Sequence, residues 1–340
     1  MYAFPTFDLE RDGPTVVEVP AGALGVLNDA YFRYVQDVGP AGPDKGKGGK
    51  YLILPPGYEG DVPKGYFVMR PRTYDNWMLI RYSIADGLDK AAAFIKSNLR
   101  IYPLAKKDNP PKMEFVSGSD TAWNSVHANN FHFYEELNAV IQKEPLEFLN
   151  TETRGLFASI GIKKGKPFDP DPRMKKILVD AVAIGNAAAR SIVWYPREDK
   201  NMSGIRVFKD RGWFTGFNDK NVFFNGPDGF TMNTDARVAF HYPYTVVTPA
   251  MANPKPGSGS DYGIAYLDAH GQPFDGAKTY KVTLPKGIPA EAFWSFTLYD
   301  NQTRAMLQTD QQFPGVSSLN EDMQQNADGS FDVYFAPEAP

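Results

Sequence analysis

The sequence predicts a mainly β protein with a helical part. Short runs rich in β-branched and aromatic residues are separated by Gly, Pro and Asp turn signals, as in antiparallel β-domains. The composition agrees, because aromatic residues make up 14% of the chain and it holds 30 Gly and 28 Pro. Helical spacing of apolar residues is concentrated in the middle. A length of 340 residues suits two or three domains.

Residues 1–104 are expected to form an N-terminal β domain. Thr15–Val19 is a β-branched run that Pro20 closes, and the segment 89–98 is the one clear helix. The other expected strands are Tyr31–Val38, Tyr51–Leu54, Tyr66–Met69 and Trp77–Tyr82.

Residues 105–205 are expected to be helical. Apolar residues recur at helical spacing at Phe133, Leu137, Val140 and Ile141. A second helix should begin at Asp171 as N-cap, with proline in the first turn, and run to about residue 193. Its small apolar centre, residues 181–189, predicts a helix buried by close packing.

Residues 206–340 return to β signals. We expect an antiparallel β-sandwich from Tyr262 to Phe335, because Asp-Gly and His-Gly pairs punctuate its apolar runs. The expected strands are Ile264–Leu267, Thr279–Leu284, Phe293–Tyr299 and Phe331–Phe335.

Several of these stretches resemble two bacterial families of unknown function. Residues 39–51 and 54–58 resemble the family numbered 1254, whereas residues 275–280, 293–300 and 326–330 resemble its usual partner, the family numbered 1214. The resemblance implies two jelly-roll-like antiparallel β-sandwiches joined by a helical segment. It implies exported bacterial proteins, hence a periplasmic or secreted location, although no signal peptide is visible. It implies no established activity.

The family members extend past both ends of this chain. We therefore expect the first β-sandwich to be truncated at its start and the second to be truncated at its end.

Composition and spacing disfavour several classes of function. The formal net charge is −4 without a basic tract, so nucleic-acid binding is not expected. No run of eighteen apolar residues predicts a membrane span. The chain has no Cys and only four His, which lack metal-ligand spacing; no metal centre or cofactor is expected, although one His with distant carboxylates stays open.

The Gly- and Lys-rich stretch 39–50 lacks the spacing of a phosphate-binding loop. We expect a flexible hairpin connection there. A basic loop that contacts an anionic partner is the remaining alternative.

The segment 233–244 holds the candidate catalytic residues Asp235, Arg237 and His241. Whether the segment is helical or extended, Arg237 and His241 lie on one side, where an anion could be held beside a proton-transfer group. The favoured alternative is an interdomain ion-pair network. Two phenols of the segment, Tyr242 and Tyr244, are candidate ligand-binding residues.

Further ligand-binding candidates lie on both β parts. Asp300 and Arg304 follow a strand end, where loops of sandwiches carry ligands, although a turn salt bridge explains them equally well. Trp294 shares a strand face with Phe296 and should be core. The remaining candidates are Asp37, Arg81 and Trp213.

Three functions follow in order of preference. The first is binding of a small polar or aromatic ligand between the β-sandwiches, because aromatic residues are mixed with Arg and Asp. The second is a hydrolase or lyase of a carbohydrate or ester that uses the 233–244 segment. The third is a structural or assembly module with homo-oligomer contacts.

Overall fold

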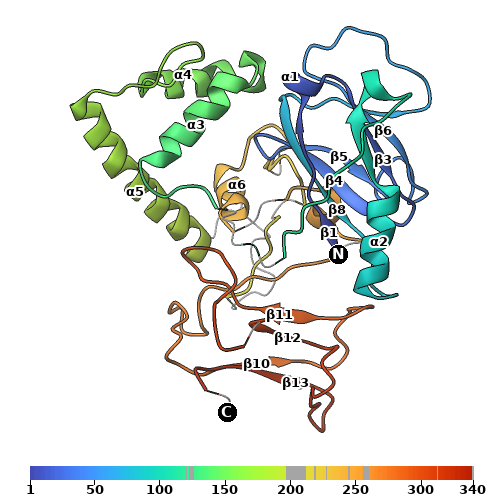
Figure 1. Ribbon diagram of the computed structural model, residues 1–340. Coiled ribbons are helices and arrows are strands. Elements are labelled where there is room, and N and C mark those ends of the chain that lie inside the picture. The colour runs from blue at the N-terminus through green and yellow to red at the C-terminus, as the bar shows by residue number, and fades with distance from the viewer. Residues whose placement is uncertain are drawn as a thin grey trace. The chain divides into compact units, whose positions relative to one another are not determined.

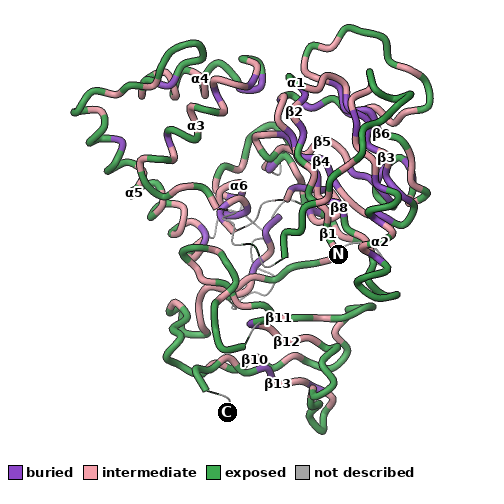
Figure 2. Tube along the Cα trace, in the orientation of Figure 1, coloured by how far each residue is buried: buried purple, intermediate pink, exposed green. Residues whose placement is uncertain are grey.

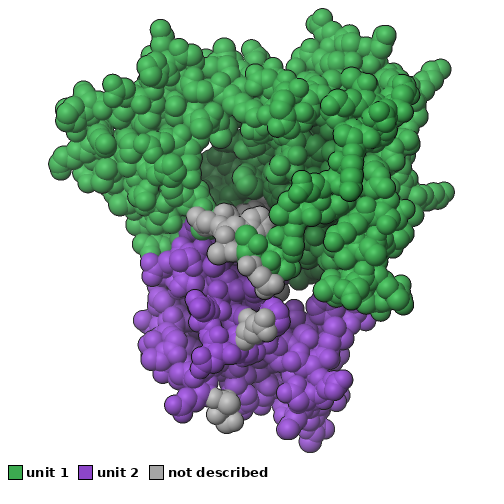
Figure 3. Space-filling view, viewed as in Figure 1, with its two compact units in different colours: residues 1–193, 197–203, 217–261 green, residues 194–196, 204–216, 262–340 purple. Residues whose placement is uncertain are grey.

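The computed structural model describes residues 1–119, 121, 126–196, 212–217, 220–226, 228–243, 246–255, 260–311 and 313–338. The chain divides into two compact units (Figure 3). Among the described residues, unit 1 holds 1–193 and 217–261, and unit 2 holds 194–196, 212–216 and 262–338. The helical segment and residues 217–261 therefore belong to the same unit as the N-terminal β-sheets.

Unit 1 contains two β-sheets (Figure 1). The first has the order β1-β8-β4-β5, with β2 also paired to β8, and the second has the order β7-β6-β3-β9. The described sheets do not close into a barrel. The strands are β1 (Tyr2–Ala3), β2 (Thr6–Asp8), β3 (Thr15–Val19), β4 (Leu24–Asp29), β5 (Tyr34–Val38), β6 (Gly49–Ile53), β7 (Phe67–Met69), β8 (Asp75–Arg81) and β9 (Arg100–Pro103).

Both sheets contribute to one hydrophobic core. Val17 and Val19 of β3 meet Leu27 of β4 and Met78 and Ile80 of β8 in this cluster, and all five side chains are buried (Figure 2). Val16, which lies next to Val17 in β3, belongs to a second buried cluster, because successive side chains of a strand point to opposite faces. The expectation of antiparallel pairing is wrong for one pair, because β6 and β7 run parallel.

The connection between β5 and β6 corrects the hairpin prediction for residues 39–50. β5 pairs with β4 and β6 pairs with β3, so this segment passes from one sheet to the other. The buried carboxylate of Asp44 organises it by accepting hydrogen bonds from Gly39 N at 2.7 Å, Gly48 N at 3.0 Å and Tyr51 Oη at 2.6 Å. A Cβ atom on Gly39, which has φ 84°, would lie 2.1 Å from a backbone oxygen.

The larger helices of unit 1 are α2 (Leu88–Asn98), α3 (His132–Lys143), α4 (Thr151–Ser159), α5 (Pro172–Trp194) and α6 (Thr234–His241). The single-turn helices are α1 (Leu9–Asp12), α7 (Pro249–Ala252), η1 (Leu104–Lys106) and η2 (Leu146–Phe148). Figure 1 shows α3, α4 and α5 grouped together. As the sequence predicts, Asp171 caps α5 by accepting a hydrogen bond from Met174 N at 2.7 Å.

Two neighbouring residues attach the end of α3 to the first sheet. The buried carboxylate of Glu144 accepts hydrogen bonds from the backbone N–H groups of Tyr74 at 2.5 Å and Asp75 at 3.0 Å. The ammonium of Lys143 lies 2.9 Å from Asp8 and 2.6 Å from Asp75. The helical segment is therefore fixed at the start of β8.

The prediction that α5 is buried is wrong. Only Leu178 and Val193 of its 23 residues are buried, and Ile184, in the small-residue centre, is 69% exposed. Figure 2 shows most of the α5 trace in the colours of exposed and intermediate residues. The helix packs through one side, where Met174, Leu178 and Val182 join the α3–α4 core. Its length and mean hydropathy, 1.4 over 18 residues, are sufficient to cross a membrane, and 11% of that window is buried.

Unit 2 has two short antiparallel pairs where a continuous sandwich was expected. β10 (Tyr280–Leu284) pairs with β13 (Phe331–Phe335), and β11 (Ser295–Thr297) pairs with β12 (Gly315–Ser317). Aromatic edge contacts hold this unit, with Trp294 against Phe296 and Phe331. Few of its described side chains are buried, so its sheets stay short.

We expect Asp44→Ala to lower the free energy of unfolding by at least about 3 kcal/mol, because three donors lose their charged acceptor inside the protein. Urea unfolding followed by circular dichroism measures the change. Asp108→Ala is the matched control, since the Asp108 side chain is 89% exposed. Equal effects of the two substitutions would show that Asp44 does not organise the segment.

Candidate functional site

Helix α6 carries the predicted catalytic residues, and of the two conformations left open for the segment the structure has the helix. Asn233 caps it by accepting a hydrogen bond from Ala236 N at 3.0 Å. Arg237 and His241, four residues apart, both contact the turn between β4 and β5. The Arg237 guanidinium lies 5.9 Å from the centre of the Tyr31 ring.

The imidazole of His241 is held by backbone oxygen atoms. Its Nδ1 lies 2.9 Å from the carbonyl oxygen of Arg237, and the carbonyl of Phe32 is also close enough to favour the charged ring. Burial outweighs both carbonyls and lowers the pKa of His241 below its usual value. General base catalysis needs a ring nitrogen that faces substrate, and these contacts describe a helix-anchoring side chain instead.

The other candidates of the segment occupy different positions. Asp235 lies in the first turn of α6, where its helical position diverges from that of Arg237. The phenol of Tyr242 lies 3.5 Å from Asn186 Oδ1 on α5. Tyr244 lies outside the described residues.

Asp37 is a buried carboxylate at the end of β5. It accepts a hydrogen bond of 2.7 Å from the hydroxyl of Thr248, which in turn caps α7 through Ala250 N. Beside it, the amide of Asn28 exchanges two hydrogen bonds with the backbone of Val247, at 2.8 and 2.9 Å. Burial raises the pKa of Asp37 to about 6, although the Thr248 hydroxyl acts in the opposite direction.

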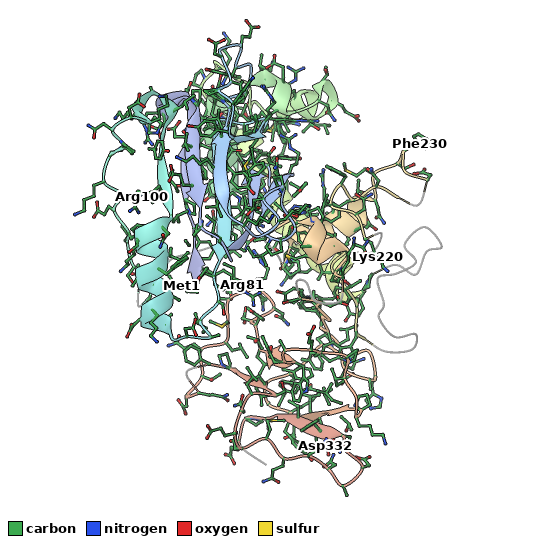
Figure 4. All side chains as sticks on the ribbon, turned by 90° about the vertical axis from the view of Figure 1, so that its right-hand side faces the viewer. Met1, Arg81, Arg100, Lys220, Phe230 and Asp332 are labelled. Atoms are coloured by element: carbon green, nitrogen blue, oxygen red, sulfur yellow. The ribbon has the colours of Figure 1, made fainter. Side chains whose placement is uncertain are left out.

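Arg81 lies at the exposed end of β8, beside the chain start (Figure 4). The terminal amine of Met1 donates a hydrogen bond of 2.7 Å to Tyr82 O. Its pKa is lowered by burial and by the charge of Arg81. Arg81 pairs with Leu24 and Asp37 pairs with Val26, so β4 lies between the two candidates.

The remaining predicted residues belong to unit 2. Trp213 and Trp294 both pack edge-on against Phe296, so their rings serve the small core of that unit. Asp300 accepts hydrogen bonds from two backbone N–H groups of its own turn, which lower its pKa. Arg304 donates to Gln302 O at 2.9 Å. These contacts describe the inside of a turn.

Unit 1 contains a pocket that sequence reasoning missed. Its volume is about 380 Å³, and α3, η2, α4 and the loop after α4 surround it. The wall is largely apolar and includes Ile141, Phe148, Phe157 and Ile162, with Arg154 on the same wall. Thr151, Arg154 and Ala158 are three and four residues apart, so they share one face of α4. This spacing is the signal in the sequence that could have indicated the pocket.

Two guanidinium groups next to Phe148 keep a buried N–H without an acceptor among the described residues. Arg154 donates Nη2 to Thr151 Oγ1 at 3.2 Å, whereas its buried Nε has no partner. Arg33 donates Nε to Asp29 at 2.7 Å and Nη1 to Phe148 O at 2.6 Å, whereas its buried Nη2 has no partner. Such donors are costly in a protein interior unless an acceptor arrives.

Two other charged residues that line the pocket, Glu144 and Lys164, are engaged in hydrogen bonds. Burial raises the pKa of Glu144, while the backbone N–H groups of Asp75 and Tyr74 oppose that rise. Lys164 donates hydrogen bonds to the carbonyl oxygens of Gln142, Lys143 and Glu144 at the end of α3. Among the residues that the structure describes, no group of three His, Asp or Glu could hold a metal ion.

Comparisons with known proteins agree with the two-part arrangement of the chain. The model of the family described as protein of unknown function (DUF1254) matches residues 1–103. The model of the family described as protein of unknown function (DUF1214) matches residues 259–340. The chain therefore belongs to the proteins that carry a DUF1254 region followed by a DUF1214 region. No curated protein matches it.

A solved structure shares the fold. The crystal structure of the VPA0106 protein from Vibrio parahaemolyticus matches with a TM-score of 0.53 and 16% sequence identity. The match covers 98% of this chain and 76% of that chain. At this identity the similarity shows the fold alone.

We expect Asp37→Asn to change how stability depends on pH. Because the folded-state pKa lies above the ordinary value of 3.8, ionisation of Asp37 costs stability as the pH rises through about 6. The variant should therefore gain up to about 3 kcal/mol over the wild type between pH 4 and pH 7, since one pKa unit corresponds to about 1.4 kcal/mol.

Urea unfolding at several pH values measures this difference. Asp108→Asn, at an exposed position, should track the wild type throughout. A gap between Asp37→Asn and the wild type that stays constant with pH would refute the buried ionisation.

Proposed function

We propose that the protein binds a small ligand with an aromatic or apolar body and one anionic group in the α3–α4 pocket of unit 1. The observation that carries the proposal is the buried Nε of Arg154, which has no acceptor among the described residues and lies on the wall of a largely apolar cavity that Lys163 and Lys164 also line. An incoming carboxylate or similar anion supplies the missing acceptor. The free-energy cost of the unpaired donor, about 1–3 kcal/mol, is then recovered on binding.

Size and chemistry support the same ligand class. A volume of about 380 Å³ falls within the range of small-molecule sites. Aromatic and aliphatic walls favour an apolar ligand body, whereas a guanidinium favours a planar anion such as a carboxylate. This places the ligand within one unit, whereas the sequence pointed to a site between two β-sandwiches.

We also propose a cellular location and a finer description of the fold. The family resemblance supports a bacterial protein that meets its ligand outside the cytoplasm, in the periplasm or after secretion. The finer fold expectation, a jelly-roll-like sandwich in each β part, is supported in unit 1 by the core that its two sheets share. The sheets would then form the scaffold to which Glu144 and Lys143 fix the pocket.

Isothermal titration calorimetry with 2-naphthoate and its neutral analogue 2-naphthamide tests the proposal. The wild type should bind 2-naphthoate at least about tenfold more tightly than 2-naphthamide, which corresponds to ~1.4 kcal/mol from the guanidinium. Arg154→Met should lower the affinity for 2-naphthoate to the level of the amide. Arg72→Met, at an exposed position, should change neither affinity.

A second variant tests the cavity itself. Ala158→Phe adds a ring to the pocket wall and should abolish binding of both compounds while thermal unfolding stays cooperative. The proposal fails if 2-naphthoate does not bind at millimolar concentration, or if Arg154→Met and Arg72→Met bind it equally well.

A further inference from the structure

Helix α5 has an apolar stripe that faces away from the unit 1 core. Ile177, Ala181, Ile184 and Ala188 follow one another at spacings of four, three and four residues, so they share one side of the helix. Ile177 is 42% and Ile184 69% exposed, and both alanines are exposed. The side of the helix that packs lies next to the stripe, because Leu178 and Val182 each follow a stripe residue and so lie about 100° around the helix from it.

Positive charge gathers at the N-terminal end of this stripe. From Lys163 to Trp194 the chain carries seven Lys or Arg residues and three Asp or Glu residues, within a protein of formal net charge −4. Arg173 lies four residues before Ile177 and continues the line of the stripe. Lys166 and Lys176 are also exposed, and Lys176 lies 4.0 Å from Asp180.

We propose that the exposed face of α5 binds the surface of an anionic phospholipid bilayer. An exposed apolar face beside basic side chains is the pattern of helices that lie in the membrane interface. Lipid phosphates complement the charge of Arg173 and Lys166, while Ile177 and Ile184 enter the outer part of the acyl region. The proposal is independent of the ligand pocket.

Two other occupants of this face are less compatible with the charges and contacts. A second copy of the chain packed on the stripe in parallel would bring the two Arg173 residues together. Like charges at such a contact oppose association. Spanning the bilayer would pull Leu178 and Val182 out of the α3–α4 core. Binding to the membrane surface leaves that core intact and uses only the exposed side of α5.

Cosedimentation with vesicles tests the proposal. The full chain should sediment with vesicles of equal parts phosphatidylglycerol and phosphatidylcholine at 0.1 M salt, and much less with pure phosphatidylcholine. Ile177→Gln/Ile184→Gln should lower the partition coefficient at least tenfold. The control Ile84→Gln/Val116→Gln, at exposed apolar positions elsewhere in unit 1, should not lower it.

A variant with fewer positive charges measures the electrostatic contribution to vesicle binding. Arg173→Gln/Lys166→Gln should lower binding about 25-fold, since each basic side chain near an anionic surface contributes roughly fivefold. The control Lys90→Gln/Lys96→Gln, exposed on α2, should bind like the wild type.

Four outcomes overturn the proposal. They are absence of binding to phosphatidylglycerol vesicles, equal binding by the α5 variants and their controls, and resistance of the bound protein to extraction at alkaline pH, which indicates a spanning helix. The fourth is a dimer in light scattering that only the Ile177/Ile184 variant disrupts, which assigns the face to a second copy of the chain.

Discussion

Unit 1 depends on the buried carboxylate of Glu144. It is the last residue of the α3 region, yet it satisfies two backbone N–H groups at the start of β8. Backbone donors inside a protein must find acceptors, so this side chain fixes where the helical segment meets the sheet. The position of Phe148, and with it the wall of the pocket and the acceptor for Arg33, follows from that attachment.

Arginine side chains recur near Tyr31 and Phe148, where helix, turn and sheet meet. Arg33 is committed to Asp29 and to a backbone carbonyl, and its guanidinium lies 5.3 Å from the centre of the Tyr31 ring. Arg237 approaches the same ring from α6. A guanidinium can stack and donate at once, which suits it to positions where helix, turn and sheet meet. Arg154 shares this chemistry and lacks only an acceptor for Nε.

Local sequence signals predicted the elements that depend on local chemistry. Thr15–Val19 and Phe331–Phe335 are strands at the expected bounds, and Asp171 with Pro172 fixed the start of α5. Local signals did not predict which strands pair with each other. Whether residues 39–50 form a hairpin or pass to the other sheet depends on Asp44 and on strands that are distant in the sequence. The exposure of Ile184 was also hidden, since an apolar helix has the same sequence whether protein or another environment covers it.

The sequence predicted only part of the candidate site, because local signals do not reveal partners that are distant in the chain. The sequence identified Asp37 as a ligand-binding candidate, yet it could not supply its partner Thr248, which lies 211 residues further along the chain. It placed Arg237 and His241 on one helix side correctly, but it could not supply the carbonyl of Phe32, which is distant in the sequence. Arg154 drew no attention because an arginine on a short helix is ordinary until its surroundings are apolar.

The hydrogen bonds between Asn28 and Val247 also bear on how the protein is made. They join residues 219 positions apart, and the two compact units alternate along the chain. During synthesis, unit 1 cannot reach its final contacts until about three quarters of the polypeptide has left the ribosome. Until then, Asn28 in the N-terminal sheets lacks its hydrogen-bond partner Val247. The first residues of unit 2 leave the ribosome before the segment that completes unit 1.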